Sequence, residues 1–205
     1  MDSDLIPLER PRAERADAAR NRRLLLDTAR RMIEETGAEN VTMDGLAEQA
    51  GVGKGTVYRR FRTRAGIFVA LLDEDERAFQ QRVLSGPPPL GPGAAPADRL
   101  IAYGQGRITF LMENHAVARA ALGQARPVAV AGGPGLTRVH IRLLLDQAGV
   151  GADHLDALTL QLAAALEGPI LLYLATPGTE ENEDTRSLQA LAEGWKVLVT
   201  RVCRP

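Results

Sequence analysis

The chain has 205 residues, of which 45% are hydrophobic, 25% charged and 4% aromatic, and its 25 basic and 26 acidic side chains give a net charge of −1. This composition is typical of a globular protein with one core or two unequal domains, and it excludes a disordered or fibrous chain. Averaged over the whole chain, the near-zero charge also argues against a nucleic-acid partner.

Cysteine content and apolar runs narrow the class further. The single cysteine, Cys203, excludes a disulfide framework and a thiolate metal cluster, and it fits a reducing cytoplasm. The N-terminus carries acids before any basic run and no continuous apolar segment, so we expect no secretory signal. The most apolar stretch, residues 155–175, contains Glu167 and Pro169, which favours a buried helix over a membrane span. We therefore expect a cytoplasmic protein with no membrane partner.

The charges are not evenly distributed along the chain. Residues 10–66 carry 13 basic and 8 acidic side chains, a net +5, whereas the rest carries 12 basic and 18 acidic, a net −6. The sharpest excess is GVGKGTVYRRFRTRAG at 51–66, with five basic residues and no acid. A solvated charged face is the plain interpretation, but such a segment also attracts a phosphate backbone.

Helical periodicity dominates the N-terminal part. Apolar spacing and caps predict helices over residues 20–36, 43–50, 54–61 and 64–83, with Thr42 and Thr63 as N-caps. The second and third of these are short and joined by a tight glycine-containing turn, behind a longer first helix. These are the elements of a helix-turn-helix DNA-binding unit.

The third predicted helix has one apolar and several polar faces. If Val57 and Phe61 point inward, its other faces present the residues that can reach a major groove, namely Lys54, Thr56, Tyr58, Arg59 and Arg60. Backbone N–H groups near its start, at Gly53 and Gly55, would lie close to phosphate or base edges.

The C-terminal part is also helical. Residues 85–96 contain five prolines and three glycines and predict a loop. Helical patterns follow at 97–125 (irregular towards its end), 136–148, 153–176 and 183–202, and no useful period-2 segment occurs. The fold class is therefore predicted to be all-α.

The stretch LAEQAGVGKGTVYRRF, preceded by Thr42 and followed by TRAGIF, resembles the N-terminal signature of TetR-type transcriptional regulators over about residues 20–72. The C-terminal part, with GPILLYL after a long apolar helix, resembles the ligand-binding and dimerisation region of that family. The resemblance implies a homodimer that places the third helix of each subunit in a palindromic operator, and a small-molecule pocket in the C-terminal domain. In such regulators ligand binding usually releases the DNA.

Residue by residue, the resemblance assigns candidate DNA contacts. Thr42 is similar to the backbone-contacting cap of the second helix, Arg59 to a variable position that reads bases, and Arg64 to a phosphate-contacting residue. Lys54, Thr56 and Tyr58 match the contact residues of the recognition helix. The chain departs from the family pattern in having Gly53 where serine is frequent and Gly66 where an acid is frequent, and we expect both glycines to weaken local capping.

Two other kinds of site are disfavoured. A phosphate-binding loop would need glycine at position 48, which is Glu48, and a preceding strand where this sequence is helical. The three histidines lack metal-ligand spacing, so we expect no metal site and no cofactor. No nucleophile and base pair stands out, and an enzyme is not expected.

Candidate effector and dimer contacts lie in the C-terminal part. His140, on the apolar face of its helix, is either a hydrogen-bonded core histidine or a polar group of a pocket. The full set of candidate effector-binding residues is Tyr103, Arg107, Phe110, His140, Leu144, Gln161 and Tyr173. The last two helices are predicted to form a two-fold four-helix interface through Leu160, Ala164, Leu171, Leu188, Leu191 and Trp195.

The sequence therefore predicts a helix-turn-helix DNA-binding domain at residues 1–66, disordered or arm-like before about 18, and a helical ligand-binding and dimerisation domain at 67–205. The predicted function is a ligand-responsive transcriptional regulator, a repressor that binds a palindromic operator as a homodimer and is released by a small molecule. The alternatives are an all-α enzyme or carrier that uses the C-terminal pocket, and an architectural DNA binder without a ligand. The identity of the ligand and of the operator stays open.

Overall fold

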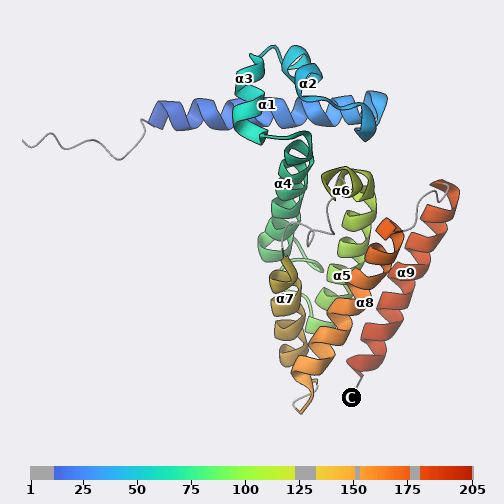
Figure 1. The fold of residues 1–205 in the computed structure, drawn as a ribbon. Helices are drawn as coiled ribbons and strands as arrows, with labels where there is room; N and C mark the ends of the chain where they lie inside the picture. Colours follow the sequence, from blue (N-terminus) through green and yellow to red (C-terminus); the bar gives the residue numbers. More distant parts are fainter. Residues whose placement is uncertain (1–11, 123–132, 151–152, 176–180, 205) are drawn as a thin grey trace, which may run out of the picture. The chain divides into compact units, whose positions relative to one another are not determined.

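A computed structural model describes residues 12–122, 133–150, 153–175 and 181–204 (Figure 1). All regular structure in these ranges is helical, as the sequence predicts. The elements of the N-terminal part are α1 (Arg12–Thr36), the 3-10 helix η1 (Ala38–Asn40), α2 (Met43–Gln49), α3 (Lys54–Phe61) and α4 (Arg64–Ser85). Those of the C-terminal part are α5 (Pro96–Glu113), α6 (His115–Leu122), α7 (Gly133–Gln147), α8 (Leu155–Ala175) and α9 (Glu181–Val202).

The chain divides into two compact units after Leu71. The predicted boundary at residue 66 lies five residues earlier. The first turns of α4 therefore count with the first unit, and their Ile67 and Phe68 are fully buried. A further difference is that α1 begins at Arg12 and not near residue 20. The sequence RAERADAAR consists mainly of good helix formers, so the helix extends into the stretch that was expected to be arm-like.

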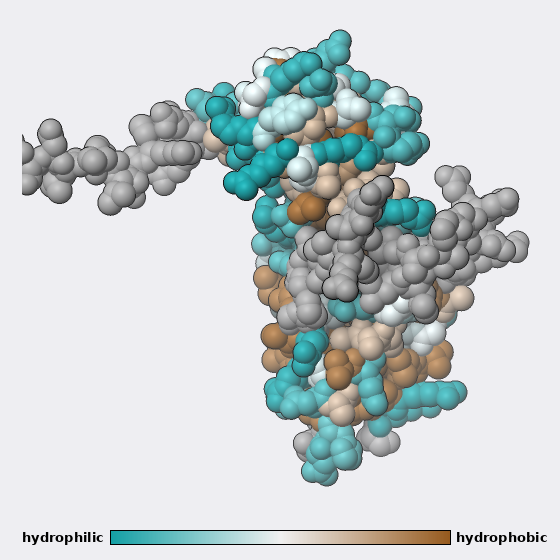
Figure 2. All heavy atoms as spheres, viewed as in Figure 1, coloured by the Kyte–Doolittle hydropathy of each residue, from teal (hydrophilic) through white to brown (hydrophobic). Residues whose placement is uncertain are grey.

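The first unit is a small helical core. Apolar side chains at helical spacing on α1, among them Leu25, Leu26 and Ala29, are buried together with Leu46 of α2 and Val57 of α3. Burial of these side chains, at about 1.5–3 kcal/mol for a large one, holds α2 and α3 in place. In Figure 2 hydrophilic residues cover most of the visible face of this unit.

The second unit is organised around α5, which packs against α6, α7, α8 and α9. Its core includes Leu100, Ile141, Leu144, Leu166 and Val199, all at most 1% exposed. The helix predicted to run irregularly to residue 125 instead stops at Asn114, the C-cap of α5, and α6 begins at His115. Apolar residues are more frequent on the visible face of this unit (Figure 2).

Within the described residues, none of the helices combines the length and the apolar character that crossing a membrane requires. The apolar α8 contains Pro169, as the sequence indicates, and lies within the second unit (Figure 1).

Candidate nucleic-acid interface and C-terminal sites

The turn between α2 and α3 is built from a cap, a glycine and short backbone hydrogen bonds. Thr42 is the N-cap of α2, and its Oγ1 accepts a hydrogen bond from the N–H of Gly45 at 3.0 Å, which confirms the predicted cap. Gly51 has a φ of 65°, a conformation that favours glycine, and the Val52 N–H donates to the Ala47 carbonyl at 3.0 Å. The chain thus leaves α2 and enters α3 within four residues.

The predicted inward and outward faces of α3 are the observed ones. Val57 is fully buried and Phe61 is 6% exposed, so these two side chains anchor the helix in the core. Tyr58 is 48% exposed, so its ring is available to a partner. Lys54, Arg59 and Arg60 are exposed as well, whereas Thr56 is half-buried. The outer surface of α3 is therefore basic with one aromatic ring, a combination suited to a nucleic-acid duplex.

The two glycines at the start of α3 have open space beside their backbone. Gly53 is the N-cap, and it makes no side-chain cap hydrogen bond. Nothing lies within 4 Å of the position that a Cβ would take at Gly53 or at Gly55. Unpaired N–H groups at a helix N-terminus attract phosphate, so both glycines suit the DNA contact predicted for them.

Lys54 forms an ion pair within the helix-turn-helix unit. Its Nζ lies 2.8 Å from Oδ2 of Asp44 in the first turn of α2, and both side chains are exposed. The hydrogen bond to Asp44 and the charge of that carboxylate raise the pKa of Lys54 above its ordinary value, so the amine stays charged. Asp44 is not among the DNA contacts predicted from the sequence. Only the contact between α2 and α3 brings the two residues together.

The other arginines of the basic segment differ in their surroundings. Arg60 donates to the carbonyl of Ala18 in α1 at 2.5 Å. Arg59 is exposed and has no hydrogen-bond or ion-pair partner in the part of the chain that the structure describes. Arg62 follows α3 with a φ of 64°, which is rare for a residue with a side chain and costs about 1–3 kcal/mol. Its exposed charge next to α3 was not among the predicted contacts.

Arg64 is placed differently from the role that the resemblance implies. Its Nε donates to the Val41 carbonyl at 2.6 Å, and its Nη2 donates to the Ala38 and Glu39 carbonyls at 2.6 and 3.0 Å. The guanidinium also lies 5.1 Å from the centre of the Phe68 ring. These contacts tie α4 to the segment between α1 and α2, so the structure gives Arg64 an internal role. Its contact with phosphate stays a prediction.

Gly66 does not weaken the cap of α4 as we expected. The N–H of Gly66 donates to the Thr63 Oγ1 and to the Thr63 carbonyl, both at 3.1 Å. A Cβ at this position would collide with the carbonyl oxygen of Phe61. Because any larger residue would displace the end of α3, close packing explains the glycine at this position.

Five of the predicted effector-binding residues are buried in the second unit. The Tyr103 hydroxyl donates to Thr137 Oγ1 at 3.0 Å, and the Tyr103 ring lies 4.7 Å from the His140 ring, between centroids. Burial raises the pKa of the Tyr103 hydroxyl above its ordinary value. Burial, followed by the nearby charge of Arg99, lowers the pKa of His140 to about 4, so this histidine is neutral at physiological pH.

Of the other five candidate effector-binding residues, three are buried, one is exposed and one has a side chain outside the described residues. Arg107 forms an ion pair with Glu76 of α4, and its guanidinium lies 5.1 Å from the Phe110 ring centre. Leu144 is fully buried. Gln161, in contrast, is exposed on α8 and does not belong to the buried set, and the side chain of Tyr173 lies outside the described residues. Glu76 is not among the residues predicted from the sequence, since its pairing with Arg107 joins positions 31 residues apart.

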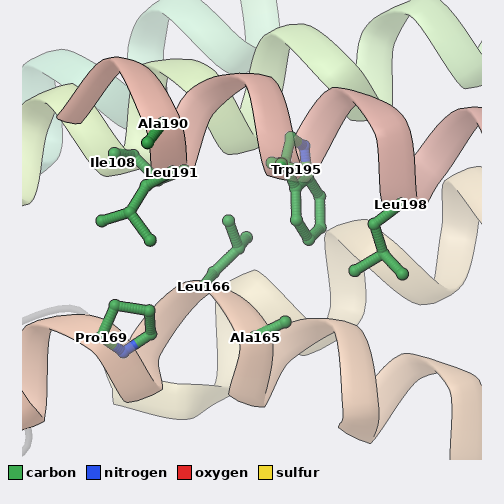
Figure 3. A pocket seen from close by; sticks show the side chains of 9 residues that line it. Ile108, Ala165, Leu166, Pro169, Ala190, Leu191, Trp195 and Leu198 are labelled. Atoms are coloured by element: carbon green, nitrogen blue, oxygen red, sulfur yellow. The ribbon is translucent and has the colours of Figure 1, made fainter. Parts of the chain in front are cut away.

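An apolar groove lies between α8 and α9 (Figure 3). Ala165, Leu166 and Pro169 of α8 face Leu191, Trp195 and Leu198 of α9 across it. Its volume is about 170 Å³, which is below the roughly 300–1,000 Å³ of small-molecule pockets, and its lining side chains are apolar apart from the indole N–H. None of the predicted effector-binding residues lines this groove.

The predicted dimer residues are divided between exposed and buried positions. Leu160 is 55% exposed and Ala164 is exposed on α8, while Leu188 and Leu191 are half-buried on α9. Trp195 is only 4% exposed, since it packs in the core of its own chain, where its Nε1 donates to the Leu100 carbonyl at 3.0 Å. Trp195 thus packs chiefly in its own core and leaves little surface for a partner. The side chain of Leu171 lies outside the described residues.

The N-terminal part of the chain is similar in sequence to known bacterial regulators. A sequence profile described as bacterial regulatory proteins of the tetR family matches residues 25–71. HTH-type transcriptional regulators of Staphylococcus aureus, from strains bovine RF122 and USA300, are 32% and 33% identical over 65 residues, which are 32% of this chain and 35% of each relative. The chain therefore matches about a third of the length of these curated relatives.

Solved structures extend the likeness of fold to most of the chain. A TetR-family transcriptional regulator from Rhodococcus sp. has a TM-score of 0.58 at 18% identity, over 91% of this chain and 100% of that one. A TetR variant from Acinetobacter baumannii in complex with minocycline has a TM-score of 0.56 at 19% identity, over 86% of this chain and 92% of that one. Both units therefore have counterparts in solved TetR-family structures.

Proposed function

Because its DNA-binding unit makes this chain a member of the tetR family of bacterial regulatory proteins, we propose that it is a homodimeric transcriptional repressor that a small molecule releases from a palindromic operator. The observation that carries this proposal is the outer surface of α3, where Lys54, Tyr58 and Arg59 are exposed while Val57 and Phe61 anchor the helix. The relatives that the comparisons give are transcriptional regulators and not enzymes, and we propose a cytoplasmic location.

On DNA, α3 enters the major groove and reads base edges, while the start of the helix contacts the backbone. Tyr58 and Arg59 are the base-reading candidates because both side chains are exposed on α3. The N–H groups after Gly53 and the amine of Lys54 supply phosphate contacts. Thr42 and Thr56, at the starts of α2 and α3, are further backbone contacts in this proposal.

The second copy of the chain packs on α8 and α9. Three observations support this choice: Leu160 and Leu198 are 55% and 38% exposed, the groove between the helices is apolar, and small residues such as Gly194 line it. Small residues let the helices of a partner approach closely, and a two-fold axis would pair the same surface of both copies. Covering this apolar face would also remove a surface that a monomer would leave in water.

The effector acts by shifting a population of conformations. One of the solved structures of similar fold is in complex with minocycline, and we propose that this chain also takes a small molecule in its second unit. The ligand favours a spacing of the two α3 helices that no longer fits half-sites about 34–36 Å apart. For this shift, the effector must bind the DNA-free conformation more tightly than the DNA-bound one.

A footprint on the DNA upstream of the gene tests the proposal. We expect protection of a palindrome with half-sites about one helical turn or a multiple of it apart. Tyr58→Ala and Arg59→Ala should change the preferred sequence, whereas Lys54→Ala should weaken binding to all sequences and reduce the salt dependence. Uniform, salt-sensitive coverage without a palindrome would contradict the proposal and favour a nonspecific DNA binder.

A further inference from the structure

Three buried nitrogen atoms on α5 and α7 have no hydrogen-bond partner in the described part of the chain. They are Arg99 Nε, Arg107 Nε and His140 Nε2. A buried polar group without a partner is destabilising, and native proteins keep few of them. Their concentration on two helices that pack together points to a group that binds there.

The chemistry of these nitrogens restricts that group. Arginine Nε carries a hydrogen and can only donate. His140 is neutral, and its ring can place its single hydrogen on Nε2. All three atoms can thus act as donors at once, so the complementary group is an acceptor oxygen.

The local charge selects among acceptors. Arg107 already faces the carboxylate of Glu76, which also accepts a hydrogen bond from Gln80 at 3.1 Å, so that end of the cluster is neutralised. At the other end, Arg99 acts on His140 as a positive charge, and among the described residues no carboxylate acts on His140 itself, although Glu76 and Glu167 act on the neighbouring Tyr103 hydroxyl. Arg99 also has no ion-pair partner within the described residues. A negatively charged acceptor is therefore favoured beside Arg99 and His140.

We propose that the effector is an organic acid whose carboxylate binds between Arg99 of α5 and His140 of α7, with its apolar body against the Tyr103 ring. This inference rests on the proposed function, because it names the chemical class of the effector. Arg99 is half-buried and His140 is 7% exposed, so the two donors lie at different depths from the surface. Tyr103 lies 4.7 Å from His140 and 5.7 Å from Phe79, between ring centroids, and provides an aromatic wall beside the acid.

Matched acid and amide probes test the charge requirement. The probes are benzoate with benzamide, and octanoate with octanamide. Thermal unfolding of the full chain is followed by the fluorescence of its only tryptophan, Trp195. We expect at least one acid to raise the unfolding midpoint by about 5 °C at 100 times its dissociation constant, while its amide has no effect. Equal effects of acid and amide, or no effect of either acid at 10 mM, would overturn the proposal.

Substitutions in the chain test whether the acid binds at Arg99. Arg99→Gln should abolish the shift, and Arg99→Lys should retain part of it because the charge stays. The control is Arg138→Gln, which removes the same charge from an exposed position on α7 and should leave the shift unchanged. A full shift in folded Arg99→Gln, or its loss in Arg138→Gln as well, would contradict this site.

Binding of operator DNA in the same buffer separates the two proposals. If the chain binds its operator and no acid stabilises it, the organic-acid site is wrong and the regulator stands. If an acid stabilises it through Arg99 but no sequence-specific DNA binding occurs, the acid site stands and the proposed function fails.

Discussion

Arg107 of α5 donates a hydrogen bond through Nη1 to the Glu76 carboxylate of α4, and the two side chains are only 6% and 8% exposed. The other carboxylate oxygen accepts from Gln80 at 3.1 Å, and the guanidinium lies near the Phe110 ring. A charge pair in an apolar core is tolerated because each charge has its partner. The pair therefore fixes α4 to α5 within the second unit.

Removing one member of this pair should be strongly destabilising. In Glu76→Leu the Arg107 charge stays buried without a partner, and we expect the free energy of unfolding to fall by about 3–5 kcal/mol. The double variant Glu76→Leu/Arg107→Met removes both charges and should recover much of the loss. Urea unfolding measures both values. A cost below about 1 kcal/mol for the single variant would show that the Arg107 charge is not buried.

Gly104 gives the indole of Trp195 its place in the core. A Cβ at Gly104 would collide with the indole ring, whose Nε1 donates to Leu100. Gly104→Ala should therefore lower the free energy of unfolding by about 1–3 kcal/mol and shift the tryptophan emission to longer wavelength. Gly168→Ala, where nothing lies within 4 Å of the new Cβ, is the control and should not destabilise the chain. Unchanged emission in Gly104→Ala would argue against this packing.

Substitution of Arg64 should lower the stability of the chain, whereas substitution of Arg59 should weaken DNA binding. Arg64→Ala removes hydrogen bonds to three carbonyls, so we expect a loss of about 2–3 kcal/mol in the free energy of unfolding. Arg59→Ala removes an exposed charge and should change stability by less than about 0.5 kcal/mol while weakening operator binding. Chemical unfolding and fluorescence anisotropy on operator DNA measure the two effects. Full stability of Arg64→Ala would contradict its internal role.

His140 should make stability depend on pH. Its pKa is lowered to about 4 in the folded chain, against an ordinary value of 6.5, so the unfolded chain binds its proton first as pH falls. The stabilisation is present above pH 6.5 and is lost as pH falls towards 4, by about 3 kcal/mol in total. His140→Leu should flatten the unfolding free energy over this window relative to the native chain. An identical pH profile for both would contradict the burial of a neutral His140.

A charge on α8 should break the proposed dimer. Leu160→Glu places a carboxylate on the surface proposed to pair with the second copy, and desolvating it should shift the protein to monomers at micromolar concentration. Val139→Glu, at a 63% exposed position of α7, is the matched control and should stay dimeric. Sedimentation velocity distinguishes the two. A dimeric Leu160→Glu, or a native chain that is monomeric at this concentration, would reject the interface.

The sequence predicts local structure well where local residues determine it. The cap at Thr42, the two sides of α3 around Val57 and Phe61, and the all-α class follow from spacing and caps that act within a few residues. The end of α5 at Asn114 was missed because helical periodicity continues into α6.

Contacts between residues far apart in the chain could not be predicted from the sequence. A basic side chain at Arg64 looks the same whether it faces phosphate or donates to carbonyls more than 20 residues away. Trp195 belongs to an apolar stripe of α9, but only the absence of a side chain at Gly104 lets it enter its own core. For the same reason the ion pairs of Glu76 and Asp44 could not be predicted, because their partners lie on other helices.

The most direct test of the regulator is the ratio of affinities for its own upstream DNA and for a scrambled duplex of equal length. Fluorescence anisotropy with both duplexes at a fixed physiological salt concentration gives this ratio. Sequence-specific recognition through α3 predicts a preference of at least about 1,000-fold for the upstream DNA, and a large loss of that preference in Tyr58→Ala. Equal affinity for the two duplexes, with the same salt dependence, would contradict the account.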